Sequence, residues 1–371
     1  MMSVDTFPCA LPFRLLPIMT PSAIIPAISY IVPIFNTAPW LPACLDSLLQ
    51  QSNANWEALL VDDGSTDDSI AIAEAYAGKD ARFRVFRHPH AGPSAVRNFA
   101  IPLCRGRWVG FLDSDDWVAP SWTASFLAAA LAWPSAEIIL QGFTRDMPNG
   151  QSSAFPLPTS PSSSPGEEHP RFLSGPALVD FLARIDRLSR GSAALMVVSQ
   201  ELLQRENLRF EKSIRASEDE CFKLDCIAAA RAVAITPETG YHYRIHRGSL
   251  TGIARSTSPS AKESRLPVEA LWKHQRALLT TLSAGGSLLH AEFLSLYLKG
   301  IYVSLFRHGQ RPGEALSILR CKRSMAKEAQ TLPPIDWTTS LLMRLGSLPA
   351  PIAYAGLALI VPIYLARLSW G

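Results

Sequence analysis

The amino-acid sequence predicts an α/β fold in which a mainly parallel sheet lies between helices. Short runs rich in β-branched residues alternate with stretches of helical periodicity over residues 28–143, as in strand–helix–strand units. Two acidic clusters, Asp62–Asp63 and Asp113–Asp116, directly follow apolar runs. Ligands of such sheets bind beyond the carboxyl ends of the strands, so the clusters mark a candidate site.

The first half of the chain is expected to supply most of the sheet. Apolar, β-branched or alternating runs predict strands at 28–34, 58–61, 82–87, 108–112 and 137–143. Asn36 or Thr37 is expected to cap the first helix, with Pro39 in its first turn. Thr66 is expected to cap the second helix.

The second half contains a segment without periodicity and several further elements. Residues 148–170 are dense in Ser and Pro, which predicts a flexible surface loop. A helix is expected at 175–188, a buried strand at 193–198 and an edge strand at 231–235. From residue 267 onward the pattern is helical.

These patterns divide the chain into four regions. Residues 1–27 are interpreted as a disordered N-terminal extension, because prolines interrupt the apolar run that an export signal needs. Residues 28–255 form the α/β domain and residues 256–344 a helical C-terminal region. The uncharged stretch 345–366 is a candidate membrane segment.

The stretch 345–366 has more than one interpretation. It is long enough to cross a bilayer, but three prolines interrupt it. It can span the membrane, lie on its surface, or pack as a buried C-terminal helix. Basic residues between Arg320 and Lys327 favour the anionic cytoplasmic leaflet, so we expect a cytoplasmic protein at the inner face of the cell membrane.

Charge and cysteine content exclude some classes of protein. The formal net charge of +3 on 371 residues argues against a protein that coats nucleic acid. The six cysteines have no metal-ligand spacing and indicate reduced thiols of a cytosolic protein. No pattern indicates the oligomeric state.

The segment Asp113-Ser114-Asp115 predicts a metal site. Two carboxylates at the end of a strand can converge on a small volume, where they repel each other. Mn²⁺ or Mg²⁺ removes that repulsion, and such a cation stabilises a diphosphate leaving group. The alternative is an acidic turn without a ligand.

Two other acidic groups can have either a functional or a purely structural role. Asp63 can accept a hydrogen bond from the N–H of a nucleotide base, or it belongs to an ordinary turn before a helix. Glu218 and Asp219 precede the apolar positions of a predicted helix. Acidic residues stabilise a helix N-terminus without any ligand.

Taken together, these segments resemble glycosyltransferase family 2. The resembling motifs are ISYIVPIFN, LPACLDSLLQQ, WEALLVDDGSTDDS, AGPSAVRNFAI and RGRWVGFLDSDDW, followed more weakly by ENLRFEKSIRASEDECF and YHYRIHRGSLT. The resemblance implies a GT-A-like fold, a nucleotide-diphosphate sugar donor and inversion at the anomeric carbon. Residues 261–371 lie outside these motifs.

The resemblance also implies how the donor is bound. Pro33, Phe35 and Asp63 match positions that hold the nucleotide base, with Phe35 providing a flat apolar surface. Arg97 matches an arginine near the diphosphate, for which a planar guanidinium is suited.

The matching positions further imply the catalytic groups. Asp113, Ser114 and Asp115 fall in the motif that binds the nucleotide sugar and the divalent metal, with Asp115 as direct ligand. Asp219 matches the general base, and Glu218 is its neighbour.

The sequence leaves two alternatives for His242 and His246. Each can contact the metal or a phosphate, or each can lie at the surface without a functional role.

The acceptor is less well indicated. Relatives often carry an aromatic residue and a lysine where this chain has Ser192-Ala193-Ala194-Leu195. A glycan or lipid-linked acceptor is expected from the resemblance. The Gln-x-x-Arg-Trp motif of processive synthases is absent from the sequence, which favours transfer of a single sugar.

Other functions are less consistent with the sequence. A nucleotidyltransferase needs a glycine-rich loop near the first strand, and IVPIFNTAPW has no glycine. No Gly-x-Gly-x-x-Gly follows a predicted strand, which excludes a dehydrogenase. A catalytically inactive sugar-nucleotide-binding or scaffold protein of the same fold remains the alternative.

Overall fold

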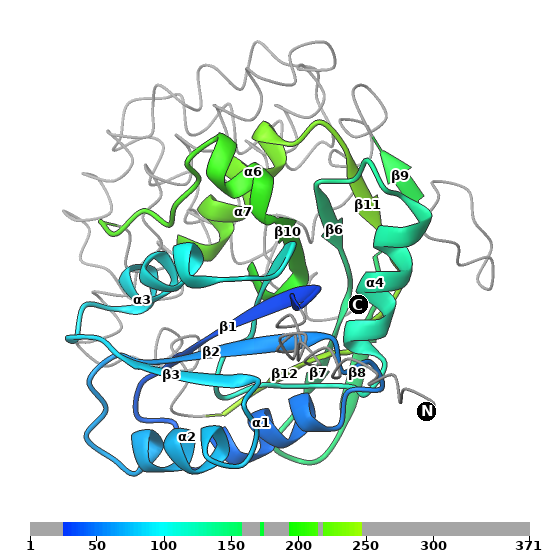
Figure 1. The fold of residues 1–371 in the computed structure, drawn as a ribbon. Coiled ribbons are helices and arrows are strands. Elements are labelled where there is room, and N and C mark those ends of the chain that lie inside the picture. The colour runs from blue at the N-terminus through cyan, green and yellow to red at the C-terminus, as the bar shows by residue number, and fades with distance from the viewer. Residues whose placement is uncertain (1–24, 158–170, 174–192, 214–217, 247–371) are drawn as a thin grey trace, which may run out of the picture.

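The computed structural model describes residues 25–157, 171–173, 193–213 and 218–246. These residues form an eight-stranded sheet, a four-stranded sheet and the helices around them (Figure 1). The helices predicted at 175–188 and beyond 267 lie outside the described residues, as does the apolar stretch 345–366.

The large sheet has the strand order β3-β2-β1-β4-β10-β6-β11-β9. Its strands are β1 (Ile28–Ile34), β2 (Trp56–Asp62), β3 (Phe83–Arg87), β4 (Trp108–Phe111), β6 (Ile138–Leu140), β9 (Arg171–Leu173), β10 (Met196–Ser199) and β11 (Val233–Ile235). Strand β1 pairs in parallel with β2 and β4, whereas β10 is antiparallel to both β4 and β6. The prediction of a mainly parallel sheet is therefore confirmed.

The position predicted for β11 was wrong. This strand pairs in parallel with β6 and antiparallel with β9, so it lies inside the sheet and not at its edge. Strand β9 comes from a part of the chain with no strand pattern, and it covers the side of β11 that was expected to face solvent.

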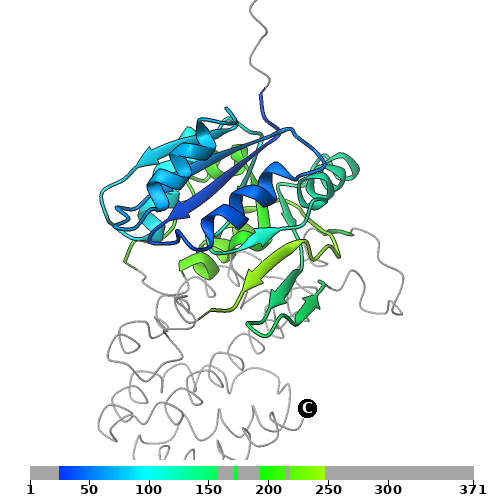
Figure 2. The same ribbon diagram turned by 90° about the horizontal axis from the view of Figure 1, so that it is seen from below.

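A second sheet packs beside the first and has the order β5-β12-β7-β8 (Figure 2). Its strands are β5 (Trp117–Val118), β7 (Phe143–Asp146), β8 (Ser152–Phe155) and β12 (Tyr241–Arg244). The single strand predicted at 137–143 is in fact the whole of β6 and the first residue of β7. The chain turns at Gly142, where an added Cβ would clash with the Phe155 carbonyl oxygen.

Strand β8 corrects the prediction of a loop over 148–170. It pairs antiparallel with β7 through a turn at Gly150, whose φ is 83°. The polar side chains of β8 are exposed, so its sequence lacks the apolar pattern that predicts a strand.

Helices lie on both faces of the large sheet (Figure 1). They are α1 (Leu41–Leu49), α2 (Ser69–Ala77), α3 (Pro93–Ala100), α4 (Trp122–Ala132), α6 (Gln200–Arg205) and α7 (Glu218–Ala229), with short 3₁₀ turns η1 (Ile101–Leu103) and η3 (Ala193–Leu195). The sequence analysis did not predict α3, α4 or α6.

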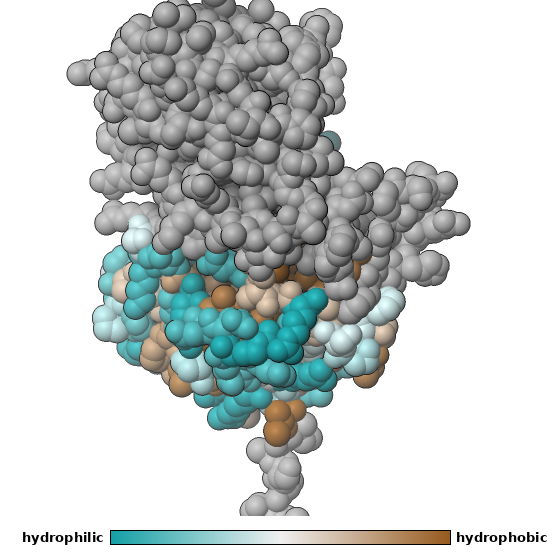
Figure 3. Space-filling view, turned by 90° about the horizontal axis from the view of Figure 1, so that it is seen from above, coloured by the Kyte–Doolittle hydropathy of each residue, from teal (hydrophilic) through white to brown (hydrophobic). Residues whose placement is uncertain are grey.

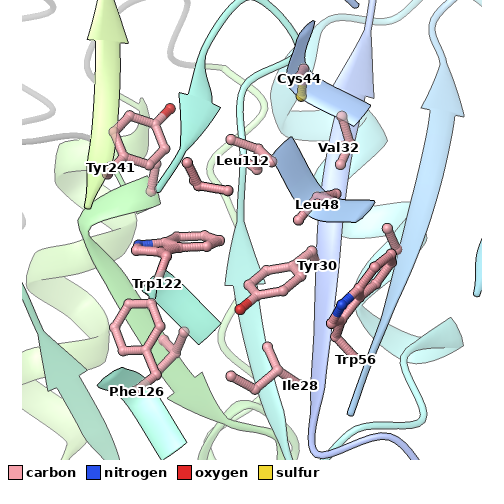
Figure 4. Packing of buried hydrophobic residues seen from close by; sticks show 14 of the residues in the cluster. Ile28, Tyr30, Val32, Cys44, Leu48, Trp56, Leu112, Trp122, Phe126 and Tyr241 are labelled. Atoms are coloured by element: carbon pink, nitrogen blue, oxygen red, sulfur yellow. The ribbon is translucent and has the colours of Figure 1, made fainter. Parts of the chain in front are cut away.

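Aromatic packing holds the helices to the two faces. On one face, the ring of Tyr30 stacks on Trp122 of α4 at 4.8 Å, and its hydroxyl lies 2.9 Å from Thr123 Oγ1 (Figure 4). On the other face, Phe111 of β4 meets Phe222 of α7 edge-on at 5.6 Å. Such pairs stabilise beyond their buried area by about 0.5–1.5 kcal/mol.

The two predicted helix caps were wrong, because the polar side chains concerned bind other loops. Helix α1 begins at Leu41 and α2 at Ser69, several residues later than expected. Asn36 has a φ of 53°, and its Oδ1 accepts a hydrogen bond from the Thr66 amide at 2.8 Å. The Thr37 hydroxyl donates a hydrogen bond to Ser114 Oγ instead of accepting one from an amide of α1.

The surface of the described residues is mainly hydrophilic in the view of Figure 3, with smaller apolar areas between. Large apolar side chains that are strongly exposed, such as Ile25 and Leu131, are scattered. Among the described helices, none has the length and apolar character needed to span a bilayer. The membrane segment predicted at 345–366 is not tested and stays a prediction.

Candidate active site

Three parallel strands end at the same edge of the large sheet and bring the candidate residues together there. Strand β1 leads into Phe35, β2 into Asp63, and β4 into the turn Asp113–Asp116, named here the acidic turn. Because the strands are parallel neighbours, their carboxyl ends form one border. The acidic clusters therefore lie on one edge of the sheet.

Two carboxylates of the acidic turn are paired with cationic or polar side chains from distant parts of the chain. The Arg97 guanidinium donates from Nη2 to Asp113 Oδ1 at 2.8 Å. The Asp115 carboxylate lies 2.8 Å from His246 Nε2. Both carboxylates remain partly exposed, with side-chain accessibilities of 30% for Asp113 and 25% for Asp115.

The other two residues of the turn are buried and fix its shape. Asp116 accepts hydrogen bonds from the Tyr241 hydroxyl and, at 2.8 Å, from the Arg244 amide. Ser114 Oγ accepts one from the Thr37 hydroxyl at 3.0 Å. The turn is thus held by β12 on one side and by the loop after β1 on the other.

Burial and mutual repulsion disfavour negative charge in the acidic turn. Burial is the main cause that raises the pKa of Asp115, and Asp113 adds to it while His246 opposes it. For Asp116, burial and then the charges of Asp115 and Asp113 raise the pKa well above its usual value. A bound cation would relieve this repulsion.

Arg97 connects the acidic turn to the start of α7. Its Nη1 donates to Glu218 Oε1 at 3.1 Å, in addition to the bond from Nη2 to Asp113. The side chain is only 6% exposed. Burial opposes its charge, but the carboxylates of Asp113, Glu218 and Asp219 outweigh burial and raise its pKa. Both terminal nitrogens are therefore committed to ion pairs, and the predicted contact with diphosphate stays a prediction.

The two acidic residues at the start of α7 differ in environment. Glu218 is buried, and burial together with Asp219 raises its pKa, although Arg97 opposes the shift. Asp219 is only partly buried, and its Oδ1 accepts a hydrogen bond from the Glu220 amide at 2.8 Å. Asp219 is thus the more accessible of the two to a substrate.

Asp63 organises the loop between β3 and α3. Its side chain is 5% exposed, and its two oxygens accept hydrogen bonds from the Ala91 amide at 2.8 Å and the Gly92 amide at 2.9 Å. The His90 ring nitrogen Nδ1 is 3.0 Å from Asp63 Oδ2. Phe35 is exposed and stacks on His90 at 4.5 Å. The carboxylate therefore already has protein donors, and the base-binding role stays a prediction.

Pro33 lies in β1 opposite Val61 and is partly buried. It stands two residues before Phe35 on the same strand end, so the three residues assigned to the base lie around one loop junction.

The structure separates the two histidines whose roles the sequence left open. His246 is at the acidic turn, and its ring lies 4.0 Å from that of Trp40. His242 instead stacks on Trp117 at 3.6 Å, with Nδ1 3.2 Å from Asp146 Oδ2. Burial lowers the pKa of His242 although Asp146 opposes the shift.

Sequence reasoning missed Trp40 and Tyr241, and it included Asp116 in the acidic cluster without assigning it a role. Tyr241 falls in a recognisable strand pattern, but its pairing with β5 joins residues more than a hundred positions apart.

The donor atoms at the acidic turn suit a hard divalent cation. Among the described residues, no group of three or more His, Cys, Asp or Glu side chains is arranged to hold a metal ion. Mg²⁺, however, typically uses one or two carboxylates and takes its other ligands from water and phosphate oxygens. Asp113 and Asp115 fit that requirement, because each retains an exposed carboxylate.

Comparison with known proteins agrees with this geometry. The model described as Glycosyl transferase family 2 matches residues 29–160. The uncharacterised glycosyltransferase EpsJ of Bacillus subtilis is 34% identical over 232 residues, which cover 62% of this chain and 64% of EpsJ. The succinoglycan biosynthesis protein ExoO of Rhizobium meliloti is 27% identical, with coverages of 64% and 66%. The chain therefore spans less than two thirds of the length of these relatives.

A solved structure confirms the type of fold. Staphylococcus aureus TarS, residues 1–349 in complex with UDP-GlcNAc, superposes with a TM-score of 0.66 at 18% identity. The match covers 89% of this chain and 90% of that structure. The described domain has the GT-A architecture expected from the sequence.

Proposed function

We infer that the chain transfers a single sugar from a nucleotide-diphosphate donor to an acceptor hydroxyl group, because residues 29–160 match the model of glycosyl transferase family 2. One structural relationship carries the proposal. Arg97 joins the acidic turn to the start of α7, so carboxylates suited to the leaving group and to the attacking group lie on either side of one buried cation.

The proposed chemistry is a direct displacement with inversion. Asp219 accepts the proton of the acceptor hydroxyl as that oxygen forms a bond to the anomeric carbon. The bond between the anomeric carbon and the diphosphate oxygen breaks, and its electron pair leaves with the diphosphate. A general base of this kind contributes roughly 10²–10⁴-fold to the rate.

Buried Arg97 positions the groups that carry this chemistry. Its two ion pairs hold Asp113 and Glu218 at a fixed separation, and Glu218 precedes Asp219 directly. A fixed base is effective because it must lie within about 3 Å of the acceptor oxygen. Glu218 is proposed to orient α7, not to take up the proton.

A divalent cation, Mn²⁺ or Mg²⁺, is the cofactor we propose. Asp115 and Asp113 would hold it, with Asp115 as the direct ligand. When bound, such a cation stabilises the negative charge that develops on a diphosphate leaving group.

We propose a uridine diphosphate sugar as donor and a surface polysaccharide or a lipid-linked glycan as acceptor. The donor class is supported by TarS, which has been crystallised with UDP and with UDP-GlcNAc. The acceptor class is supported by ExoO, a succinoglycan biosynthesis protein. Phe35 and Pro33 are proposed to contact the base from one side, with Asp63 accepting a base N–H in addition to its loop amides.

A panel of nucleotide sugars tests the proposal. UDP-GlcNAc, UDP-glucose, UDP-galactose and GDP-mannose are each mixed with the full chain and Mn²⁺, and thermal unfolding is followed. A ligand at a hundred times its dissociation constant adds about 2.7 kcal/mol of stability. Stabilisation by a UDP sugar, with metal-dependent release of UDP, is the expected result.

Stabilisation without any hydrolysis or transfer would instead favour an inactive sugar-nucleotide-binding protein. No stabilisation by any member of the panel would contradict the proposal.

A further inference from the structure

A small cavity lies beside the proposed site, between the ends of the two sheets and α7. It has room for one water-sized group, about 10 Å³, and Gln141 and Lys223 are its polar lining residues. Its other walls are apolar, formed mainly by Leu140, Phe143 and Leu195.

Gln141 has unused hydrogen-bonding capacity in this cavity. The residue is fully buried, and within the described part of the chain neither its Oε1 nor its Nε2 has a hydrogen-bond partner. A carboxamide offers two donors and one acceptor, and buried polar groups in proteins are nearly always partnered. The side chain is thus suited to a ligand that both donates and accepts.

Lys223 adds a buried cation to the same cavity. It is 1% exposed, and burial lowers its pKa to about 8, although Glu220 and Asp219 oppose the shift. It lies four residues after Asp219 on α7, which is about one helical turn or roughly 6 Å along the axis. The cavity is therefore next to the proposed base.

Sheet register places Gln141 at the same edge as the acidic turn. Val197 of β10 pairs with Gly110 of β4 and with Ile139 of β6. Gln141 follows β6, and its amide donates to the Leu195 carbonyl at 3.0 Å. Two strand spacings separate β6 from β4, roughly 10 Å. A sugar attached to a diphosphate at the acidic turn can span that distance.

We propose that Gln141 and Lys223 bind one hydroxyl oxygen of the sugar carried by the nucleotide donor. This inference rests on the proposed transferase function. A hydroxyl group matches the cavity in size, donates to Gln141 Oε1, and accepts from Gln141 Nε2 or the Lys223 ammonium. A sugar that presents a hydrogen atom there would leave the buried Gln141 carboxamide without a hydrogen-bond partner, so the cavity selects among donor sugars.

The test compares binding of UDP, UDP-glucose, UDP-galactose and UDP-GlcNAc by calorimetry, in the presence of Mn²⁺, to the full chain and to two variants. Gln141→Leu removes the amide at similar length, and Lys223→Met removes the ammonium. We expect one sugar nucleotide to bind wild type at least tenfold tighter than UDP. In each variant, the ratio of sugar-nucleotide affinity to UDP affinity should fall about tenfold. The affinity for UDP itself should stay within twofold of wild type.

Gln51→Leu is the matched control for deletion of a buried glutamine. Its Nε2 donates to the carbonyls of Ser47 and Ala119, and its Oε1 accepts from the Thr123 amide. This variant should melt at a lower temperature but keep the ratio of sugar-nucleotide to UDP affinity. Gln141→Leu should melt near wild type, because its side chain makes no hydrogen bond with the described residues.

Three outcomes separate the possibilities. An unchanged ratio in both Gln141→Leu and Lys223→Met means that the cavity holds an ordered water only, and it overturns the proposal. The proposal is also overturned if Gln141→Leu melts at a much lower temperature but keeps the wild-type ratio of sugar-nucleotide affinity to UDP affinity. Wild-type binding of UDP without preference for any sugar overturns this inference alone, whereas failure to bind UDP or any UDP sugar overturns the proposed function as well.

Discussion

The Arg97 guanidinium and the Glu218 carboxylate form a buried ion pair, with Nη1 3.1 Å from Oε1, that joins α3 to the first turn of α7. The same guanidinium also pairs with Asp113 of the acidic turn, with Nη2 2.8 Å from Oδ1. Removal of the cation would leave the buried Glu218 carboxylate and the partly exposed Asp113 carboxylate without this partner. Stability and site geometry therefore depend on one side chain.

Arg97→Met is expected to destabilise the fold by about 3–5 kcal/mol, the usual effect of breaking a buried ion pair. Urea denaturation followed by circular dichroism measures it. Arg87→Met is the control, because its pair with Glu74 is exposed and the midpoint should stay near wild type. Equal midpoints for the two variants would contradict a structural role for Arg97.

Asp219→Asn keeps the shape of the side chain and removes the proton acceptor. The turnover number should fall by roughly 10² or more, while donor affinity changes little. Glu220→Gln, on the same turn of α7, controls for a change of charge and should retain turnover. Loss of turnover in Glu218→Gln with normal turnover in Asp219→Asn would move the base one residue upstream.

Asp115→Ala should abolish donor binding that depends on Mn²⁺ and leave the fold intact, because the carboxylate is partly exposed. Calorimetry with UDP, with and without Mn²⁺, is the measurement. Asp146→Ala is the control, since Asp146 also pairs with a histidine but has no proposed metal-binding role, although it accepts a hydrogen bond from Trp117, directly after the acidic turn. A metal-dependent affinity that survives in Asp115→Ala excludes this residue as the ligand.

The acidic turn should also affect the dependence of stability on pH. Burial and neighbouring carboxylates raise the pKa of Asp116 in the folded state, whereas an unfolded Asp has a pKa of about 3.9. The folded state therefore binds this proton more tightly, so the contribution of Asp116 to stability grows as pH falls and is lost as pH rises.

Between pH 7 and about pH 4, wild type should thus gain stability relative to Asp116→Asn, which cannot take up the proton. Urea titrations at several pH values measure the difference. A difference that stays constant across this range would argue against a raised pKa.

The membrane prediction concerns residues outside the described structure. Deletion of everything after Thr339 removes the stretch 345–366 but keeps the basic residues between Arg320 and Lys327. The full chain is expected in the membrane fraction of cells, and the shortened chain should be released more readily by salt or without detergent. Equal solubility of both chains would mean that the stretch does not hold the protein at a membrane.

Local pattern predicted the strands that carry the site but not the elements that connect them. The run at 28–34 became β1 without a change of boundary, because a parallel strand covered on both faces is apolar at nearly every position. Helix α3 was missed, since PSAVRNFA is short, begins with Pro93 and directly follows Gly92. The helix caps were predicted at the wrong residues, because Asn36 and Thr37 form hydrogen bonds with loops about 30 or more residues away.

The grouping of the carboxylates could be predicted, but not their partners. Asp63 and Asp115 follow parallel strands, so their common edge follows from topology. The pairs formed by His246 with Asp115 and by Tyr241 with Asp116 depend on a second sheet whose strands are two to four residues long. Strands this short leave too weak a periodicity to specify pairing.

The second sheet gives the acidic turn a mechanical connection to the rest of the chain. Strand β12 ends at Arg244, holds Asp116 through Tyr241 and the Arg244 amide, and leads to His246 at Asp115. The carboxylates of both Asp115 and Asp116 are bonded to this strand or to the residues that follow it directly. A displacement of β12 would therefore shift both carboxylates together.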